Sequence, residues 1–237
     1  MKVVDAVWEK RNLGVNTQEI TILASDSIEE VEKTLKTLSA EYQVVKIPTG
    51  NTKVMWKLED MGFRYIETIV HVENSLKNLE LKGIPKRIND ELTYELMNQK
   101  DRNQMFEEIR KGMFKTDRVA LDSNFSLQQA NNRYIGWISD EIEKGTEVFK
   151  YIYHNQTIGF FTFKEIARGV YYPFLAGIYK QYQNFQDQYC LINHYSYVSS
   201  KLFILKNFII SEFPKVFPDL HLNKILSLSF RLRFPLP

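Results

Sequence analysis

The chain has 237 residues, which is enough for one large domain or two small ones. Hydrophobic residues make up 44% and aromatic residues 14%, so there is ample material for a core and disorder is not expected. The formal net charge of +2 gives no reason to expect a nucleic acid or an anionic membrane as a partner. A single cysteine, Cys190, excludes a disulfide framework and a cysteine-based metal site.

The N-terminus and the histidines narrow the classes of function further. Met1 is followed by a charged, mixed sequence, and no apolar stretch is long enough to span a bilayer. We therefore expect a cytoplasmic protein without a signal peptide. No Walker-type loop, dinucleotide fingerprint or nucleophile elbow is present, so other cofactor chemistry is unsupported. The four histidines lack metal-ligand spacing, which argues against a metal site; they are His71, His154, His194 and His221.

Residues 1–75 are predicted to alternate strand and helix, which describes a small α/β domain. Ser27 with Glu30 three residues later forms a capping-box pattern before the first clear helix. Gly62 suits the left-handed stop of the next helix. β-branched and aromatic residues then indicate a strand. The predicted helices are residues 28–40 and 51–62, and the predicted strands are residues 42–47 and 63–73.

Residues 74–88 are polar and contain Gly83 and Pro85, so they are the expected boundary between two domains. This boundary gives a small α/β domain at residues 1–80 and a second domain at residues 81–237. The same segment could instead be an ordered crossing strand.

The second half of the chain is predicted to form two helices, a three-stranded meander, a helix and a last strand. The short connections between the three strands require antiparallel neighbours. The last strand alternates apolar and polar residues, so it is a candidate sheet edge and dimer contact. The predicted helices are residues 101–113, 127–144 and 187–202, and the strands are residues 147–154, 157–164, 169–176 and 226–234.

Three groups of residues resemble the GNAT superfamily of N-acetyltransferases. The likeness covers about residues 8 to 192 and is similar to the two-domain type that includes the dTDP-fucosamine acetyltransferases. It implies a mixed, mainly antiparallel α/β sheet flanked by helices, a smaller N-terminal α/β domain, and acetyl-CoA as co-substrate without a metal. The groups are residues 8–14 (WEKRNLG) with 46–48 (KIP) and 58–63 (LEDMGF), 114–122 (FKTDRVALD) with 130–137 (ANNRYIGW), and 174–184 (FLAGIYKQYQN) with 189–192 (YCLI).

The resemblance implies where the cofactor binds. In GNAT proteins the strand before the pyrophosphate loop splays from its neighbour, and the pantetheine arm of CoA pairs with its main chain. That strand corresponds here to residues 171–178, where a bulge at Gly177 would let the ligand approach closely. From the meander alone, a buried hairpin strand with a glycine kink is the alternative. The cofactor-binding residues so implied are Leu175, Gly177, Ile178, Tyr179, Gln183, Asn184, Gln186, Asp187 and Gln188.

The pyrophosphate loop departs from the family pattern, which has glycines where Gln186 and Gln188 stand. Glycine tolerates positive φ and lets phosphate oxygens approach the backbone amides at a helix N-terminus. A left-handed conformation at a residue with a Cβ costs roughly 1–2 kcal/mol. Asp187 adds repulsion against the pyrophosphate, while the two glutamine amides could partly act as donors. A fold that has lost its cofactor site is therefore the alternative.

The resemblance also points to candidate catalytic and acceptor residues. The family's general acid is usually a tyrosine on the helix after the fifth strand, and His221 lies near that position. A surface histidine without a role is the alternative. Thr116, Asp117 and Arg118 would lie beside the acceptor, with Arg118 pairing a carboxylate or phosphate. An Asp–Arg salt bridge that holds this loop is the alternative.

Two functions follow as hypotheses. The first is an acyl-CoA-dependent N-acetyltransferase acting on the amine of a small molecule, an amino sugar being one acceptor class. The second is a non-catalytic GNAT-fold protein that serves in binding or dimerisation, because its CoA loop lacks glycines. A homodimer is a candidate assembly under either hypothesis.

Overall fold

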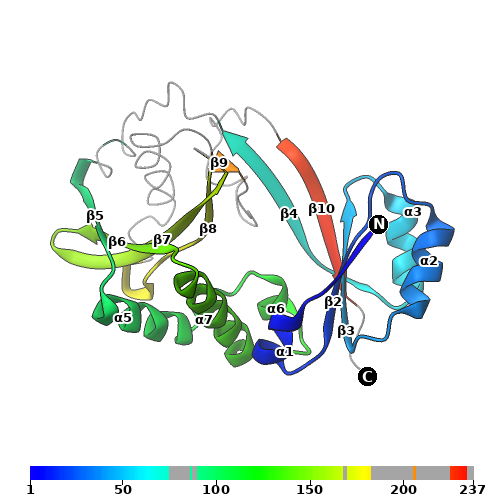
Figure 1. The fold of residues 1–237 in the computed structure, drawn as a ribbon, viewed down its shortest axis with the longest axis horizontal. Coiled ribbons are helices and arrows are strands. Elements are labelled where there is room, and N and C mark those ends of the chain that lie inside the picture. Colours follow the sequence, from blue (N-terminus) through cyan, green and yellow to red (C-terminus); the bar gives the residue numbers. More distant parts are fainter. Residues whose placement is uncertain (75–85, 87–89, 168–169, 183–204, 207–224, 234–237) are drawn as a thin grey trace.

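The computed structural model describes residues 1–74, 86, 90–167, 170–182, 205–206 and 225–233. These residues form one ten-stranded sheet with helices packed on both faces (Figure 1). Its strand order is β1-β2-β3-β10-β4-β9-β8-β7-β6-β5, and all pairs are antiparallel except β2 with β3 and β8 with β9. The predicted mixed, mainly antiparallel α/β sheet flanked by helices is therefore confirmed.

The bounds of the predicted helices and strands that lie in the described residues are close to those observed, whereas the elements at residues 7–13, 92–96 and 118–121 were not predicted. The helices are α1 Val7–Leu13, α2 Ile28–Thr37, α3 Thr52–Asp60, α5 Gln99–Arg110, α6 Arg118–Leu121, α7 Leu127–Glu143 and the 3-10 turn η1 Lys180–Tyr182. The strands are β1 Lys2–Asp5, β2 Thr17–Thr21, β3 Tyr42–Pro48, β4 Arg64–Asn74, β5 Leu92–Leu96, β6 Glu147–Tyr153, β7 Gln156–Ala167, β8 Val170–Ile178, β9 Leu205–Lys206 and β10 Ile225–Arg233.

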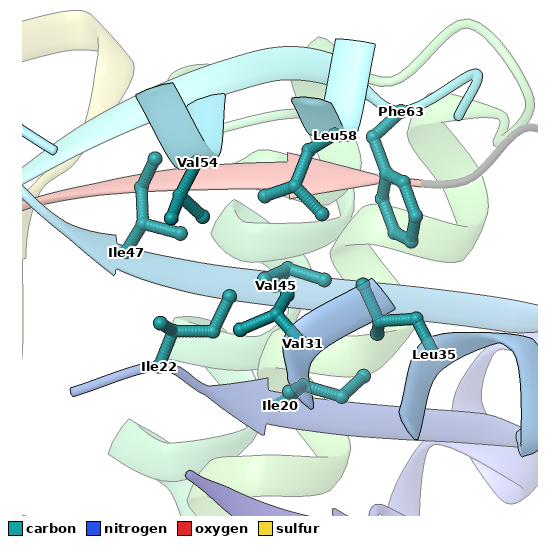
Figure 2. Close-up of a cluster of buried hydrophobic side chains, with 9 residues drawn as sticks. All are labelled: Ile20, Ile22, Val31, Leu35, Val45, Ile47, Val54, Leu58 and Phe63. Carbon is teal, nitrogen blue, oxygen red and sulfur yellow. The ribbon is translucent and has the colours of Figure 1, made fainter. Parts of the chain in front are cut away.

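The N-terminal part packs α2 and α3 against one face of β2 and β3. Ser27 accepts a hydrogen bond from the Glu30 amide, which confirms the predicted capping box. Apolar residues that point inward from both helices and both strands close a continuous core (Figure 2). Its buried members are Ile20, Ile22, Val31, Leu35, Val45, Ile47, Val54, Leu58 and Phe63.

The C-terminal strand β10 lies inside the sheet, between β3 and β4 (Figure 1). Ser229 is opposite Pro48 on one side and opposite Ile69 on the other. The predicted strand is thus confirmed, but its expected position at a sheet edge is wrong, because both of its edges are hydrogen-bonded. A homodimer stays a prediction, but it could not form through an unpaired edge of β10. The boundary expected near residue 80 falls outside the described residues and stays a prediction as well.

The second part places α5 and α7 on one face of β5 to β8 (Figure 1). Ser126 and Gln129 form the second predicted capping box at the start of α7. His154 and Asn155 have positive φ and make the tight turn between β6 and β7. The buried core under α5 and α7 contains Met105, Ile109, Tyr134, Ile138, Val148 and Phe160. The helix expected at residues 187–202 lies outside the described residues.

Two absences hold for the described part of the chain. None of its helices combines the length and the apolar character that a membrane crossing requires. None of its histidine, cysteine and carboxylate side chains gather into a group that could hold a metal ion.

The position of β10 generates a test. A chain that ends at residue 224 lacks the strand between β3 and β4, so the main-chain groups on both flanking edges lose their partners. We expect this chain to lose its cooperative thermal unfolding transition, measured by circular dichroism. A chain that ends at residue 233 is the control and should keep the full-length midpoint. Equal midpoints for both chains would contradict the role of β10.

Candidate functional site

The structure describes a strand partner for only a short part of the β8 edge that faces away from β7, and we call this the open edge of β8. β7 pairs with one edge of β8 from Val170 to Ile178. On the other edge, within the described residues, β9 pairs with β8 at Tyr171 alone. β9 also pairs with the end of β4 at Glu73 and Asn74. β8 and β4 therefore meet at β9 and diverge from it (Figure 1).

The register shows which main-chain groups of β8 face the open edge. The Tyr179 amide donates to the Ile158 carbonyl at 2.8 Å, so this pair is a hydrogen-bonded one. Because antiparallel pairs alternate, the groups of Leu175 and Gly177 face β7. The N–H and C=O groups of Ala176 and Ile178 face the open edge. Ile178 is among the expected cofactor-binding residues and Ala176 is not; cofactor binding by this strand stays a prediction.

The β-bulge in β8 lies four residues before the expected place. Thr162 is opposite Leu175 and Lys164 is opposite Tyr172, so β8 has two residues where β7 has one. The extra residue is at positions 173–174. Pro173 suits this bulge, because proline has no N–H group that would need a partner in the neighbouring strand. The Thr162 hydroxyl bonds both the Leu175 carbonyl at 2.8 Å and the Leu175 amide at 3.0 Å. The strand bends next to its open edge.

Because Gly177 has no side chain, the side chains of Met113 and Phe114 can pack against the backbone of β8 at this position. A Cβ at this position would lie 2.5 Å from the Met113 sulfur and 3.3 Å from the Phe114 ring. Met113 and Phe114 therefore pack directly on β8. The bulge expected at Gly177 is not seen, because Gly177 remains in register with Phe160.

The segment after β8 begins the expected cofactor loop. Tyr179 is fully buried, and burial raises the pKa of its hydroxyl, with Glu108 and Asp101 adding to the effect. The Tyr182 amide donates to the Tyr179 carbonyl and closes η1. The remaining predicted loop residues and the candidate acid lie outside the described residues; they are Gln183, Asn184, Gln186, Asp187, Gln188 and His221. Their roles stay predictions.

A buried ion network joins α1, α6 and α7. Glu9 is completely buried and accepts hydrogen bonds from two guanidinium groups. Arg133 Nε lies 2.8 and 3.0 Å from its two oxygens, and Arg118 Nη2 bonds the first of them. Arg118 Nη2 also lies 3.2 Å from Glu19 Oε1. Burial lowers the pKa of Arg118, but the carboxylates of Glu9 and Glu19, together with Tyr42, outweigh it, so the net shift is upward.

Asp117 connects this network to the loop before α6. Its Oδ1 accepts the Ala120 amide at 2.9 Å as the N-cap of α6. Its Oδ2 lies 3.3 Å from Arg133 Nη1. Burial raises the pKa of Tyr134 well above its ordinary value, and the negative charge of Asp117 raises it further.

The predicted acceptor-binding residues differ in their exposure to solvent. Thr116 is exposed, whereas Arg118 is 1% exposed. Asp117 and Arg118 hold the loop by ion pairs, as in the alternative, but their partners are Arg133 and Glu9. Acceptor binding by Thr116, Asp117 and Arg118 stays a prediction.

Sequence reasoning missed Glu9 and Arg133 as buried partners. Glu9 lies four residues before the buried Leu13, so the two share one face of α1. That spacing was the available signal for Glu9. It could not distinguish a buried carboxylate from one at the solvent boundary, because the partners come from distant segments.

Comparison with solved structures places the fold. A functionally unknown conserved protein from Staphylococcus epidermidis is similar with a TM-score of 0.57 and 11% identity, over 92% of this chain and 84% of that one. A GCN5-related N-acetyltransferase from Kribbella flavida is similar with a TM-score of 0.51 and 10% identity, over 93% and 81%. A conserved protein of unknown function from Bacteroides thetaiotaomicron has a TM-score of 0.53 and 9% identity, over 92% and 79%.

These likenesses show the fold alone, because the identities are low. No family model matches the sequence, and no curated protein matches it either. The chain therefore has the fold of GCN5-related N-acetyltransferases. The narrower resemblance to dTDP-fucosamine acetyltransferases stays a prediction.

Gly159 offers a test of the contact between β7 and β8. A Cβ at this position would collide with the Gly177 carbonyl oxygen and lie 3.0 Å from the Ile178 Cα, both of which are backbone atoms. We expect Gly159→Ala to lower the free energy of unfolding by about 1–3 kcal/mol, measured in urea. Ile166→Ala, at an exposed position on the same strand, should change it by less than about 0.5 kcal/mol. Similar values for the two variants would argue against a tight contact at Gly159.

Proposed function

We propose that this protein is an acyl-CoA-dependent N-acetyltransferase that transfers an acetyl group to the amine of a small molecule. The open edge of β8 carries this proposal. The main-chain groups of Ala176 face away from β7, and the described part of the chain places no strand beside them. The main-chain edge of a strand can pair with an extended chain as an added strand, so a ligand with amide groups in an extended conformation would fit beside Ala176. The pantetheine arm of CoA has that chemistry.

The bulge and the fold support the same proposal. The bulge at residues 173–174 lies beside the open edge, and bulges often redirect groups next to active sites. The fold is shared with an N-acetyltransferase, although a fold by itself does not prove an activity. An amino sugar is the acceptor class that the sequence resemblance implies, and acetyl-CoA supplies the thioester carbonyl that the amine attacks.

The chemistry requires three things of the protein. The ammonium must lose a proton, the tetrahedral oxyanion must be stabilised, and the departing thiolate must gain a proton. His221 is the sequence candidate for the last role. Outward-facing N–H groups on β8 are suitable donors for a carbonyl oxygen of the bound thioester.

A binding or dimerisation protein without catalysis is the second candidate function. The observation that favours it is the pair Gln186 and Gln188, which stand where the family has glycines. Under this proposal the open edge of β8 is present but the pyrophosphate is held weakly.

Isothermal titration with acetyl-CoA separates the two candidates. The acetyltransferase proposal expects saturable heat and a raised melting temperature, because a ligand that binds the folded state stabilises it. Mass spectrometry of a panel of amino sugars and polyamines with acetyl-CoA then identifies an acetylated acceptor. No heat and no thermal shift at millimolar ligand would end the acetyltransferase proposal. Binding that appears only in a Gln186→Gly, Gln188→Gly double variant would favour the second candidate.

A proline at the open edge tests the ligand's main-chain contacts directly. Ala176→Pro removes an outward N–H and leaves the ladder to β7 intact. We expect acetyl-CoA to bind weaker by about 1 kcal/mol, or about fivefold, measured by calorimetry. Leu96→Pro introduces the same change on β5, the last strand of the sheet, and should leave the affinity unchanged. Equal affinities for both proline variants would show that the ligand does not pair with β8.

A further inference from the structure

The N-terminal helix α1 contributes one carboxylate to the interior of the second half of the chain. Glu9 is fully buried, and Arg118 and Arg133 both donate to it from α6 and α7. A buried ion pair of this kind is costly to break, because removal of one partner leaves the other charge uncompensated. The positions of both guanidinium groups therefore depend on Glu9.

The second link runs from the two arginines to the loop before α6. Arg133 lies 3.3 Å from Asp117, which caps α6 through the Ala120 amide. Arg118 follows Asp117 directly and is held between Glu9 and Glu19. The loop at residues 113–118 is thereby fixed at its C-terminal end from α1.

The third link runs from this loop to β8. Met113 fills the space that a side chain at Gly177 would need. The Phe114 ring packs on the Tyr134 ring at 4.4 Å and meets the Phe160 ring edge-on at 6.3 Å. The loop therefore contacts β8 at Gly177, next to Ala176, whose main-chain groups face away from β7.

We propose that Glu9 is a positioning residue, through which the N-terminal helix fixes the loop at residues 113–118 against β8 and so sets the shape of the open edge. The helix then serves the site without contacting a ligand. The effect on ligand binding rests on the proposed function, whereas the mechanical link from Glu9 to β8 does not.

The chain provides a matched control for this proposal. Arg11, two residues after Glu9 on α1, pairs with Asp140 of α7 at 2.7 Å. This pair joins the same two helices, but the Arg11 side chain is exposed. Exposed pairs contribute little to stability, and this one does not touch Asp117 or the loop. Arg11→Ala therefore removes an α1–α7 contact without disturbing the buried network.

Hydrogen–deuterium exchange of the full chain, read by mass spectrometry, tests the mechanical link. In Glu9→Gln, amides in residues 113–121 and in β8 should exchange about tenfold faster relative to those of β6, which pairs with β5 and β7 and not with β8. Arg11→Ala should leave this ratio unchanged. A uniform increase in every segment would show a purely structural role and overturn the proposal. So would faster exchange confined to α1 and α6, with β8 unchanged.

A second variant covers the case in which Glu9→Gln does not fold. Glu9→Asp keeps the buried carboxylate but shortens the side chain by one methylene group. The two arginines must then shift toward it, while their positive charges stay paired with a negative one. We expect the same selective increase in β8, at a smaller factor. Unchanged exchange in β8 of this variant would overturn the proposal.

Calorimetry with acetyl-CoA tests the consequence for the site. If the full-length protein binds, Glu9→Gln should weaken the affinity by about tenfold, and Arg11→Ala should not change it. Equal affinity in Glu9→Gln would overturn the role of Glu9 at the site. If the full-length protein does not bind acetyl-CoA, the proposed function fails, and the exchange experiment alone decides the link between Glu9 and β8.

Discussion

The fold depends on the insertion of the C-terminal strand between two N-terminal ones. β10 hydrogen-bonds β3 on one edge and β4 on the other, so the first and last elements of the chain share one sheet. β4 in turn pairs with β9, and β9 with β8. Because β10 is paired along both of its edges, it places β4 at a defined position relative to β8. The divergence of β8 from β4 is a consequence of this arrangement (Figure 1).

An open edge inside a sheet of ten strands has a physical cost that a ligand can offset. The short contact at Tyr171 holds the two halves together, and the bulge at residues 173–174 bends β8 beside it. Pro173, which has no N–H to donate, is tolerated at such a bulge. Thr162 compensates for the disturbed ladder by bonding Leu175 through its side chain. The strand thus keeps its pairing with β7, while the main-chain groups of Ala176 face away from β7.

Charged groups fix the position of the loop at residues 113–118, which lies beside β8. The buried network contains Glu9, Arg118 and Arg133. The centre of the Tyr42 ring lies 5.8 Å from the Arg118 guanidinium carbon. Buried ion pairs fix the relative orientation of the elements that carry them more reliably than they add net stability, because desolvation offsets much of their attraction. Their geometry specifies how α1, α6 and α7 meet. The apolar core in Figure 2 could tolerate many substitutions of similar volume, whereas this network depends on each of its members.

The sequence by itself determined the elements, because helical and strand periodicities, the caps at Ser27 and Ser126 and the tight turn at Asn155 are local properties. Family resemblance added the expectation that β8 lies beside a cofactor site. Only the tertiary structure decided that residues 225–233 lie inside the sheet, since alternation shows a buried face but not how many neighbours a strand has. It also decided that Arg118 pairs with Glu9, 109 residues away, because no spacing rule reaches across such a separation.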